Sequence, residues 1–309
     1  MNIIVFPGQG SQKIGMGKEL SDNFAEAKQV FEEVNDALNF NLTRVMWDGT
    51  DKEIALTSNA QPALMACSIA TLRVLNKITN KNLSDLACYV CGHSLGEYSA
   101  MTAAEVFSLS QCATLLRLRG EAMQKAVPIG KGAMAALIGA NIDTTKKVID
   151  KVKCYGVCDI ANDNSQGQVV ISGDILAVEN AMKFSKDFGI KKAILLPVSA
   201  PFHCKLMRPA QIIMEEALNK LNFEKPLVPI ISNVNVLPEN NPDKLRKNLI
   251  DQVTGTVRWR ETMEFVEKKG IKKIIELGSG KVLTGIAKRM IKDIVTINIE
   301  NTEDFKNFI

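Results

Sequence analysis

The stretch LACYVCGHSLGEYSAMTAAEVF, residues 86–107, decides the fold. Its first part, residues 86–92, is a short and mostly apolar run that ends in glycine, which is typical of a buried strand. Residues 95–107 are rich in Ala, Leu and Met and predict a helix. The residues between and around them, 92–96, form the pattern G-x-S-x-G. In this strand-to-helix context, the pattern predicts a strained turn that exposes the hydroxyl of Ser94.

Ser94 is a candidate nucleophile, although a capping serine in a glycine-bounded turn would have the same pattern. It precedes the helix that begins at Leu95, where the helix dipole favours developing negative charge. The backbone N–H of Leu95 is therefore one expected oxyanion donor. A serine nucleophile needs a base, and the chain contains two histidines. His93 is the neighbour of Ser94 on a sharp turn, where adjacent side chains diverge, so His203 is the expected general base.

Further apolar runs alternate with helical segments along the chain. This alternation indicates an α/β protein with a mostly parallel sheet covered by helices on both faces. The uncharged stretch 54–72 predicts a loop that leads into a buried helix, because it contains several polar residues and a proline. The other strands expected in the sheet are 2–6, 226–232 and 271–278, and the other helices are 110–127, 208–222 and 258–269.

The middle of the chain has a different pattern. Strand 132–140, helix 144–153, a hairpin around NDNSQG, helix 175–189 and strand 191–198 follow one another. This order, βαββαβ, is that of a ferredoxin-like unit. Residues 128–198 are therefore expected to form a ferredoxin-like subdomain inserted into a larger α/β domain, which consists of residues 1–127 and 199–309.

Composition limits the class of protein. Of 309 residues, 46% are hydrophobic and 23% are charged, which is typical of a globular protein with a large core. A formal charge of +4 is small, and no basic stretch carries interleaved aromatics, so nucleic acid is not an expected partner. No segment reads as a membrane span or a secretory signal, and a cytoplasmic location is expected.

Seven cysteines are scattered through apolar segments. An odd number in such positions predicts reduced, buried thiols and no disulfide framework. Cys88 and Cys91 form a CxxC pattern, but positions three apart in a strand face opposite sides, so they are not expected to share a metal.

Several motifs together carry a family resemblance. In order and spacing, along nearly the whole chain, they resemble bacterial malonyl-CoA:acyl-carrier-protein transacylases. The motifs are FPGQGSQ (6–12), SNAQPAL (58–64), GHSLGEYSA (92–100), RGEAMQ (119–124), NSQGQVVISG (164–173), SAPFHC (199–204) and GSGKVLTG (278–285).

The resemblance implies this fold, with residues 1–127 and 199–309 as an α/β-hydrolase-like catalytic domain and residues 128–198 as the ferredoxin-like subdomain. It also assigns roles to residues. It implies that Ser94 is acylated and that His203 activates it, oriented by the main-chain carbonyl of Gln252 in place of an aspartate. It also implies that the N–H of Gln12 joins that of Leu95 as an oxyanion donor.

Substrate binding is expected to centre on one arginine. Arg117 and Arg119 lie two positions apart on the same predicted helix and cannot share a face, so only one can enter the site. The helical pattern alone does not show which of the two arginines enters the site. The RGEAMQ motif of the resembled family implies that it is Arg119. A guanidinium offers two parallel donors to a carboxylate, which suits a malonyl group. The other substrate-binding residues expected are Met123, Phe202 and Asn162.

The implied reaction is transfer of a malonyl group from malonyl-CoA to the phosphopantetheine thiol of acyl carrier protein, a transient partner, in fatty acid synthesis. The CoA thioester is a substrate, and neither a metal nor a bound cofactor is expected. A monomer without membrane attachment is expected.

Three alternatives stay open. One is a serine hydrolase or thioesterase, which shares the nucleophile turn but ordinarily has an acid between Ser and His. Another is an inactive paralogue that binds carrier protein, although Ser94, His203 and Arg119 are all present. The third is an acyltransferase that accepts a different extender unit.

Overall fold

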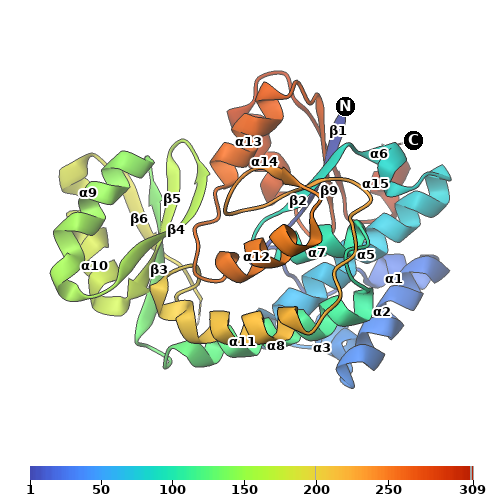
Figure 1. Ribbon diagram of the computed structural model, residues 1–309, viewed down its shortest axis with the longest axis horizontal. Helices are drawn as coiled ribbons and strands as arrows, with labels where there is room; N and C mark the ends of the chain where they lie inside the picture. Colours follow the sequence, from blue (N-terminus) through green and yellow to red (C-terminus); the bar gives the residue numbers. More distant parts are fainter. Residues whose placement is uncertain (199, 307, 309) are drawn as a thin grey trace.

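A computed structural model describes residues 1–198, 200–306 and 308 of the chain, and it contains two separate sheets (Figure 1). Ser199, which begins the SAPFHC motif and the expected second segment of the catalytic domain, lies outside the described residues. None of the described helices is both long enough and apolar enough to span a bilayer.

The larger sheet has six strands in the order β10-β9-β1-β2-β7-β8. All neighbouring strands are parallel except β7 and β8, which are antiparallel. The mostly parallel sheet predicted from the alternating pattern is therefore confirmed. Its strands are β1 (Asn2–Phe6), β2 (Tyr89–Gly92), β7 (Ile230–Ile231), β8 (Pro238–Glu239), β9 (Lys273–Leu277) and β10 (Val295–Ile299).

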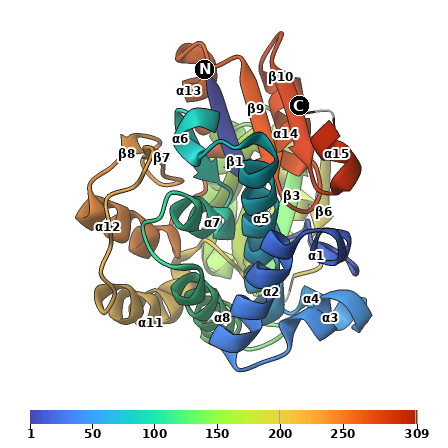
Figure 2. The ribbon, with the colours of Figure 1, turned by 90° about the vertical axis from the view of Figure 1, so that its right-hand side faces the viewer.

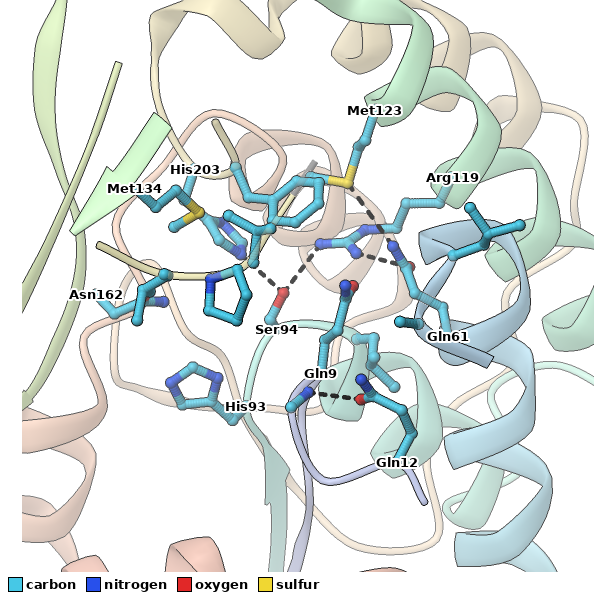
Figure 3. Close-up of a pocket in the computed structure, with 18 of the residues that line it drawn as sticks. Gln9, Gln12, Gln61, His93, Ser94, Arg119, Met123, Met134, Asn162 and His203 are labelled. Carbon is cyan, nitrogen blue, oxygen red and sulfur yellow. Dashed lines mark hydrogen bonds between the residues drawn. The ribbon is translucent and has the colours of Figure 1, made fainter. Parts of the chain in front are cut away.

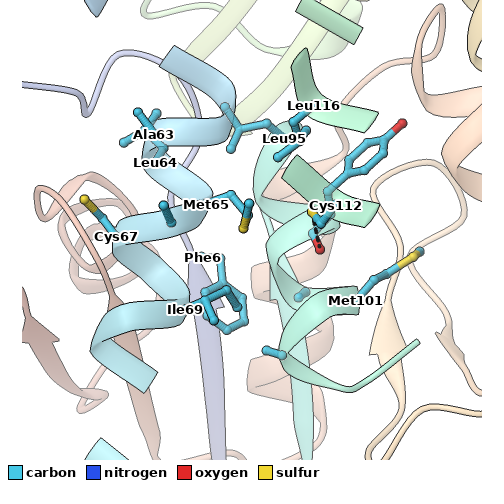
Figure 4. Close-up of a cluster of buried hydrophobic side chains, with 14 of the residues drawn as sticks. Phe6, Ala63, Leu64, Met65, Cys67, Ile69, Leu95, Met101, Cys112 and Leu116 are labelled. Atoms are coloured by element: carbon cyan, nitrogen blue, oxygen red, sulfur yellow. Dashed lines mark hydrogen bonds between the residues drawn. The ribbon is translucent and has the colours of Figure 1, made fainter. Parts of the chain in front are cut away.

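Helices cover both faces of this sheet. Successive side chains along β1 point to opposite faces, so each face carries apolar residues that helices can bury. Ile4 and Phe6 point into the larger core, and Ile3 and Val5 point into a second core on the opposite face. In the larger core α2, α5 and α8 contact one another, as Figure 2 shows, and Figure 4 shows Phe6 beside the side chains of α5. The helices around the sheet are α1 (Lys18–Asn23), α2 (Ala25–Leu38), α3 (Leu42–Asp48), α4 (Asp51–Ala55), α5 (Thr57–Thr79), α6 (Leu83–Leu86), α7 (Leu95–Ala103), α8 (Leu109–Ala126), α11 (Arg208–Asn219), α12 (Pro242–Gln252), α13 (Trp259–Lys268), α14 (Val282–Met290) and α15 (Thr302–Lys306).

The smaller sheet has four antiparallel strands in the order β4-β5-β3-β6. Along the chain its elements follow as β3-α9-β4-β5-α10-β6, which is the order of strands and helices that the sequence predicted. A separate apolar core lies between this sheet and its two helices. The elements are β3 (Gly132–Ile138), α9 (Ile142–Val152), β4 (Cys158–Ser165), β5 (Gln168–Asp174), α10 (Ile175–Phe184) and β6 (Lys192–Leu195).

Several predicted boundaries were wrong. Residues 57–62, expected in a loop because several of them are polar, form the first turns of α5, and Pro62 lies inside this helix. Helix α7 ends at Ala103, since Glu105 adopts a left-handed conformation with φ 62°. Strand β4 continues through Ser165, so the hairpin turn is much shorter than NDNSQG. Of the expected strand 226–232, only Ile230–Ile231 pairs with β2.

Within the described part of the chain, the prediction of buried thiols is confirmed for five cysteines and wrong for Cys154, which is exposed, and Cys88, which is partly buried. All seven cysteines are free, and five of them are buried. Cys91 belongs to the core around Trp259, whereas the thiol of Cys88 donates a hydrogen bond to the carbonyl of Asn2.

Candidate active site

A cavity of about 670 Å³ lies at the carboxyl ends of β1 and β2. Ligands commonly bind at this edge of a parallel sheet, because the loops that follow neighbouring strands converge there. Its walls come from both sheets: Ser94 follows β2, whereas Met134 and Asn162 belong to β3 and β4 (Figure 3). Every residue that the sequence placed at the site lines this cavity except Gln252.

Ser94 lies on a strained turn between β2 and α7. Its φ of 54° and ψ of −111° are unfavourable for a residue with a side chain. Close backbone packing forces this conformation: a Cβ on Gly96 would lie 2.2 Å from the carbonyl oxygen of Phe6. The predicted nucleophile turn is therefore present, with its hydroxyl directed into the cavity (Figure 3).

His203 reaches the hydroxyl of Ser94 from the loop that precedes α11. Its Nε2 atom lies 2.7 Å from Oγ of Ser94. Its Nδ1 atom lies 2.9 Å from the carbonyl oxygen of Gln252 and 3.2 Å from that of Gly255. Because a carbonyl oxygen can only accept, Nδ1 carries the proton, and Nε2 is left free to accept the proton of Ser94.

Burial keeps His203 in its neutral form, which is the form that can accept a proton. The side chain is 3% exposed, and this burial, together with the charge of Arg119, lowers the pKa of His203 to about 3. A pKa so low keeps the imidazole neutral at neutral pH. The two main-chain carbonyls occupy the place that the carboxylate has in a Ser-His-Asp triad.

His93 is directed elsewhere, as the turn predicted. Its Nε2 atom lies 2.9 Å from Oδ1 of Asn164, and its ring packs against Trp259 at a centroid distance of 5.6 Å. His203 is therefore the histidine that contacts Ser94.

Arg119 brings a buried positive charge next to the nucleophile. It lies on α8 and is 2% exposed. Its Nη2 donates to Oγ of Ser94 at 3.2 Å and to Oε1 of Gln252 at 2.9 Å, and its Nη1 donates to Oε1 of Gln61 at 2.7 Å. These acceptors are all neutral, and the described residues provide no ion pair for the guanidinium. Such a group attracts an anionic ligand strongly, because its charge is desolvated and not compensated by a hydrogen-bonded carboxylate.

Arg117 points away from the cavity, which confirms that the two arginines do not share a face. Its Nη1 donates to Oδ1 of Asn59 at 2.7 Å, and its guanidinium lies 4.5 Å from the ring centroid of Phe40. It does not line the cavity.

The side chain of Gln252 has a role that the sequence did not suggest. In addition to accepting from Arg119, its amide donates to the carbonyl of Ser94 at 2.9 Å and to Oε2 of Glu97 at 2.7 Å. Gln252 thus contacts Ser94, Arg119 and, through its main chain, His203. No local pattern at residue 252 signals this, because all of these partners are distant in the sequence.

The chain packs against the nucleophile turn before it reaches Gln12. A Cβ on Gly8 would lie 2.8 Å from the carbonyl oxygen of His93, so the chain at residues 8 and 9 runs against the nucleophile turn. Figure 3 shows the side chain of Gln9 extending toward Ser94, whereas Gln12 lies lower and its Oε1 accepts from the N–H of Gly10 at 2.7 Å. The N–H of Leu95 is the first in α7 and has no partner within the helix.

The three other predicted substrate-binding residues all line the cavity. Met123 and Phe202 are buried apolar residues on one side of it, and the Met123 Sδ lies 3.9 Å from Nε2 of Gln61. Asn162 lies at an irregular position of β4 beside Val257. In the residues described, no group of three or more His, Cys, Asp or Glu side chains is arranged to hold a metal ion.

Comparison with known proteins shows to which class of enzyme the chain belongs. The family model described as acyl transferase domain matches residues 3–304, and the fold and site are those of an acyltransferase. A curated relative from Bacillus subtilis, a malonyl CoA-acyl carrier protein transacylase, is 41% identical over 97% of this chain and 93% of its own. A second of the same name, from Escherichia coli, is 39% identical over 96% and 94%.

Solved structures that are similar to this chain have the same activity in their names as the curated relatives. An acyl-carrier-protein-S-malonyltransferase from Bartonella henselae superposes with a TM-score of 0.97 at 49% identity, covering 99% of this chain and 98% of that one. A malonyl-transacylase in complex with its type II PKS acyl-carrier protein has a TM-score of 0.95 at 38% identity, with coverage of 99% and 98%. The chain belongs to the malonyl CoA-acyl carrier protein transacylase family, as the resemblance of its motifs predicted.

Proposed function

We propose that this enzyme transfers a malonyl group from malonyl-CoA to the phosphopantetheine thiol of acyl carrier protein through a malonyl ester on Ser94. The observation that carries the proposal is the position of Arg119. Its buried guanidinium lies 3.2 Å from the hydroxyl that His203 contacts, so a carboxylate held there would place a nearby thioester carbon against Oγ. The names of the relatives support malonyl as the group and acyl carrier protein as the acceptor.

The reaction has two matched halves. In the first, Oγ of Ser94 attacks the thioester carbonyl while Nε2 of His203 accepts the hydroxyl proton, the C–S bond breaks, and CoA leaves with that proton. In the second, the carrier thiol gives its proton to His203 and its sulfur attacks the ester. The ester C–O bond then breaks, and Ser94 recovers the proton.

Two backbone N–H groups would hold the oxyanion formed in each half. One is that of Leu95, at the N-terminus of α7. For the second we propose Gln9 in place of Gln12, since residues 8 and 9 pack against the nucleophile turn. Met123, Phe202 and Asn162 would contact the acyl group or the thioester arm.

The reaction exchanges an acyl group between sulfur and oxygen without electron transfer, so we propose no bound cofactor. Carrier protein is proposed as a transient partner. A monomeric state, a cytoplasmic location and the absence of a nucleic-acid or membrane partner stay predictions.

We also propose the finer description of the fold. Residues 1–127 and 199–309 would form an α/β-hydrolase-like catalytic domain, and residues 128–198 a ferredoxin-like subdomain. The strand orders of the two sheets and the nucleophile turn after β2 support this description.

Intact-protein mass spectrometry tests the proposal. After brief mixing with malonyl-CoA, the wild type should carry one malonyl adduct, and Ser94→Ala should carry none. Ser99→Ala is the matched control, because Ser99 is a buried serine of α7, the helix that follows Ser94, and it does not line the cavity. An unmodified wild type would refute the mechanism. Rapid release of free malonate without any thiol acceptor would indicate a hydrolase.

A further inference from the structure

A buried asparagine from the neighbouring strand holds both sides of the nucleophile turn. Asn233 is 1% exposed and lies just beyond β7, which pairs in parallel with β2. Its Oδ1 accepts from the N–H of Ser94 at 2.8 Å, and its Nδ2 donates to the carbonyl of Gly92 at 2.7 Å. The side chain therefore spans the turn from the last residue of β2 to the nucleophile itself.

A neutral carboxamide can make both hydrogen bonds at once. One of the two backbone groups is a donor and the other an acceptor, so the bridging side chain must accept at one end and donate at the other. A carboxylate can only accept, and an alkyl side chain can do neither. The bond to the carbonyl of Gly92 is buried and the bond from the N–H of Ser94 is partly buried, and a buried polar group without a partner is costly.

Further contacts hold Asn233 in place. Its own N–H donates to Oε2 of Glu97 at 3.1 Å, and that same carboxyl oxygen accepts from Nε2 of Gln252 at 2.7 Å. Its carbonyl accepts from the N–H of Arg258 at 3.0 Å. Glu97 is fully buried, and burial raises the pKa of its carboxyl.

The two hydrogen bonds of the Asn233 carboxamide, called the bridge below, hold the strained part of the turn. Ser94 has a φ of 54°, and a residue with a side chain keeps such a conformation only where its surroundings hold it. The same conformation directs Oγ toward His203 at 2.7 Å and Arg119 at 3.2 Å. Loss of the bridge would let the turn relax and move the hydroxyl away from the base.

We infer that Asn233 is a positioning residue for the acyl transfer, which it serves by holding the Ser94 turn through its two carboxamide hydrogen bonds. Asn233 does not line the cavity, so it acts through Ser94 and not on the substrate. The inference rests on the proposed function.

The first test separates chemistry from binding. Asn233→Ala should lower the kcat of malonyl transfer by about 100-fold, with the KM for malonyl-CoA within about twofold of wild type. Asn35→Ala is the matched control, because the Asn35 carboxamide also accepts from a backbone N–H and donates to an oxygen. Both groups belong to Thr43, and the pair joins helices α2 and α3 away from the cavity. It should lose some stability and keep its kcat. A folded Asn233→Ala variant with the kcat of the wild type would overturn the inference.

The second test uses Asn233→Asp, whose carboxyl can donate to Gly92 only when it is protonated. The ratio of its kcat to that of the wild type should therefore rise as the pH falls from about 8 to about 5, by up to about tenfold per pH unit. The ionisable residues nearest the introduced carboxyl are Glu97, which accepts from the N–H of Asn233, His93, which lies within the turn, and Arg258, whose N–H donates to the carbonyl of Asn233. Arg119 and His203 contact the hydroxyl of Ser94. A ratio independent of pH would contradict the proposal, whatever happens to Asn233→Ala.

The remaining outcomes are also decisive. If neither variant folds at any pH, Asn233 serves the stability of the fold, and the positioning role is wrong. If the wild type forms no malonyl adduct, the proposed function itself fails. If the wild type forms the adduct and both variants form it equally fast, only the role of Asn233 fails.

Discussion

Nε2 of His203 lies 2.7 Å from Oγ of Ser94, although 109 residues separate them in the chain, and both residues adopt a left-handed backbone conformation. Their φ values are 54° for Ser94 and 56° for His203. Strain of this kind persists only where the surrounding structure holds it, and it gathers at functional sites. The short contact is thus maintained by two strained turns, one after β2 and one before α11.

The low pKa of His203 predicts an unusual pH profile. A histidine with its ordinary pKa would lose activity as the pH falls through about 6.5. Burial and the charge of Arg119 lower the pKa of His203 to about 3, so its neutral form persists in far more acidic solution. The rate constant for malonylation of Ser94 should therefore be nearly flat between about pH 5 and pH 8. Rapid-quench measurements with circular dichroism at each pH, to exclude unfolding, would check this, and a midpoint near 6.5 would contradict it.

Arg119 should select substrates by charge. Arg119→Ala would leave the malonyl carboxylate buried without its partner, at a cost of at least about 3 kcal/mol, or more than about a hundredfold in kcat/KM. Acetyl-CoA has no carboxylate, so acetyl transfer should be kept or increased. Arg119→Lys should recover little, because an ammonium lacks the planar fork.

Arg117→Ala is the control for this prediction, since Arg117 binds Asn59 and does not line the cavity. The specificity constants of all three variants with both acyl-CoA substrates would decide the assignment. Equal losses on malonyl and acetyl groups, or a larger change of selectivity at Arg117, would show that Arg119 does not bind the carboxylate.

Substitution of glycine by alanine should have opposite effects on the free energy of unfolding at Gly96 and at Gly285. In Gly96→Ala, the new methyl group would meet the carbonyl oxygen of Phe6 at 2.2 Å, so β1 or the nucleophile turn would have to move. We expect a loss of roughly 3 kcal/mol in the free energy of unfolding, together with loss of malonylation. In Gly285→Ala, on helix α14, the nearest atom is Nη1 of Arg289 at 3.7 Å, and we expect a gain of about 0.5–1 kcal/mol. Chemical denaturation of both variants measures these changes, and equal stabilities would refute the packing argument.

Docking of carrier protein should depend on salt. The acidic carrier implied by the family resemblance would meet a chain with a formal charge of +4, and Lys52 lies at the cavity. Transfer to carrier protein should fall on the order of tenfold between about 0.05 and 0.5 M salt, whereas transfer to a neutral small thiol should change little. Parallel kinetics with both acceptors check this. Equal salt dependence would show that electrostatic steering is unimportant.

Much of the candidate site was predictable from local sequence. The turn around Ser94 is encoded by a strand, two glycines and a helix that are adjacent in the chain, so periodicity and turn chemistry suffice to find it. His203 followed from the scarcity of histidines, and the order of strands and helices in the smaller sheet followed from the pattern over 128–198. Element boundaries were less predictable: only two residues of the expected strand 226–232 pair, because pairing depends on how far β2 extends beside it.

The sequence by itself determined which residue is placed to be the nucleophile, because a nucleophile turn is made by consecutive residues. Only the tertiary structure decided what holds that residue. The side chain of Gln252 reaches Ser94 across 158 positions of the chain, and Asn233 reaches it across 139. An amide side chain at either position carries no local signal, because its partners are brought to it only when the strands pair and their carboxyl ends meet. Hydrogen bonds between distant backbone and side-chain groups depend on that convergence, and periodicity along the chain does not contain it.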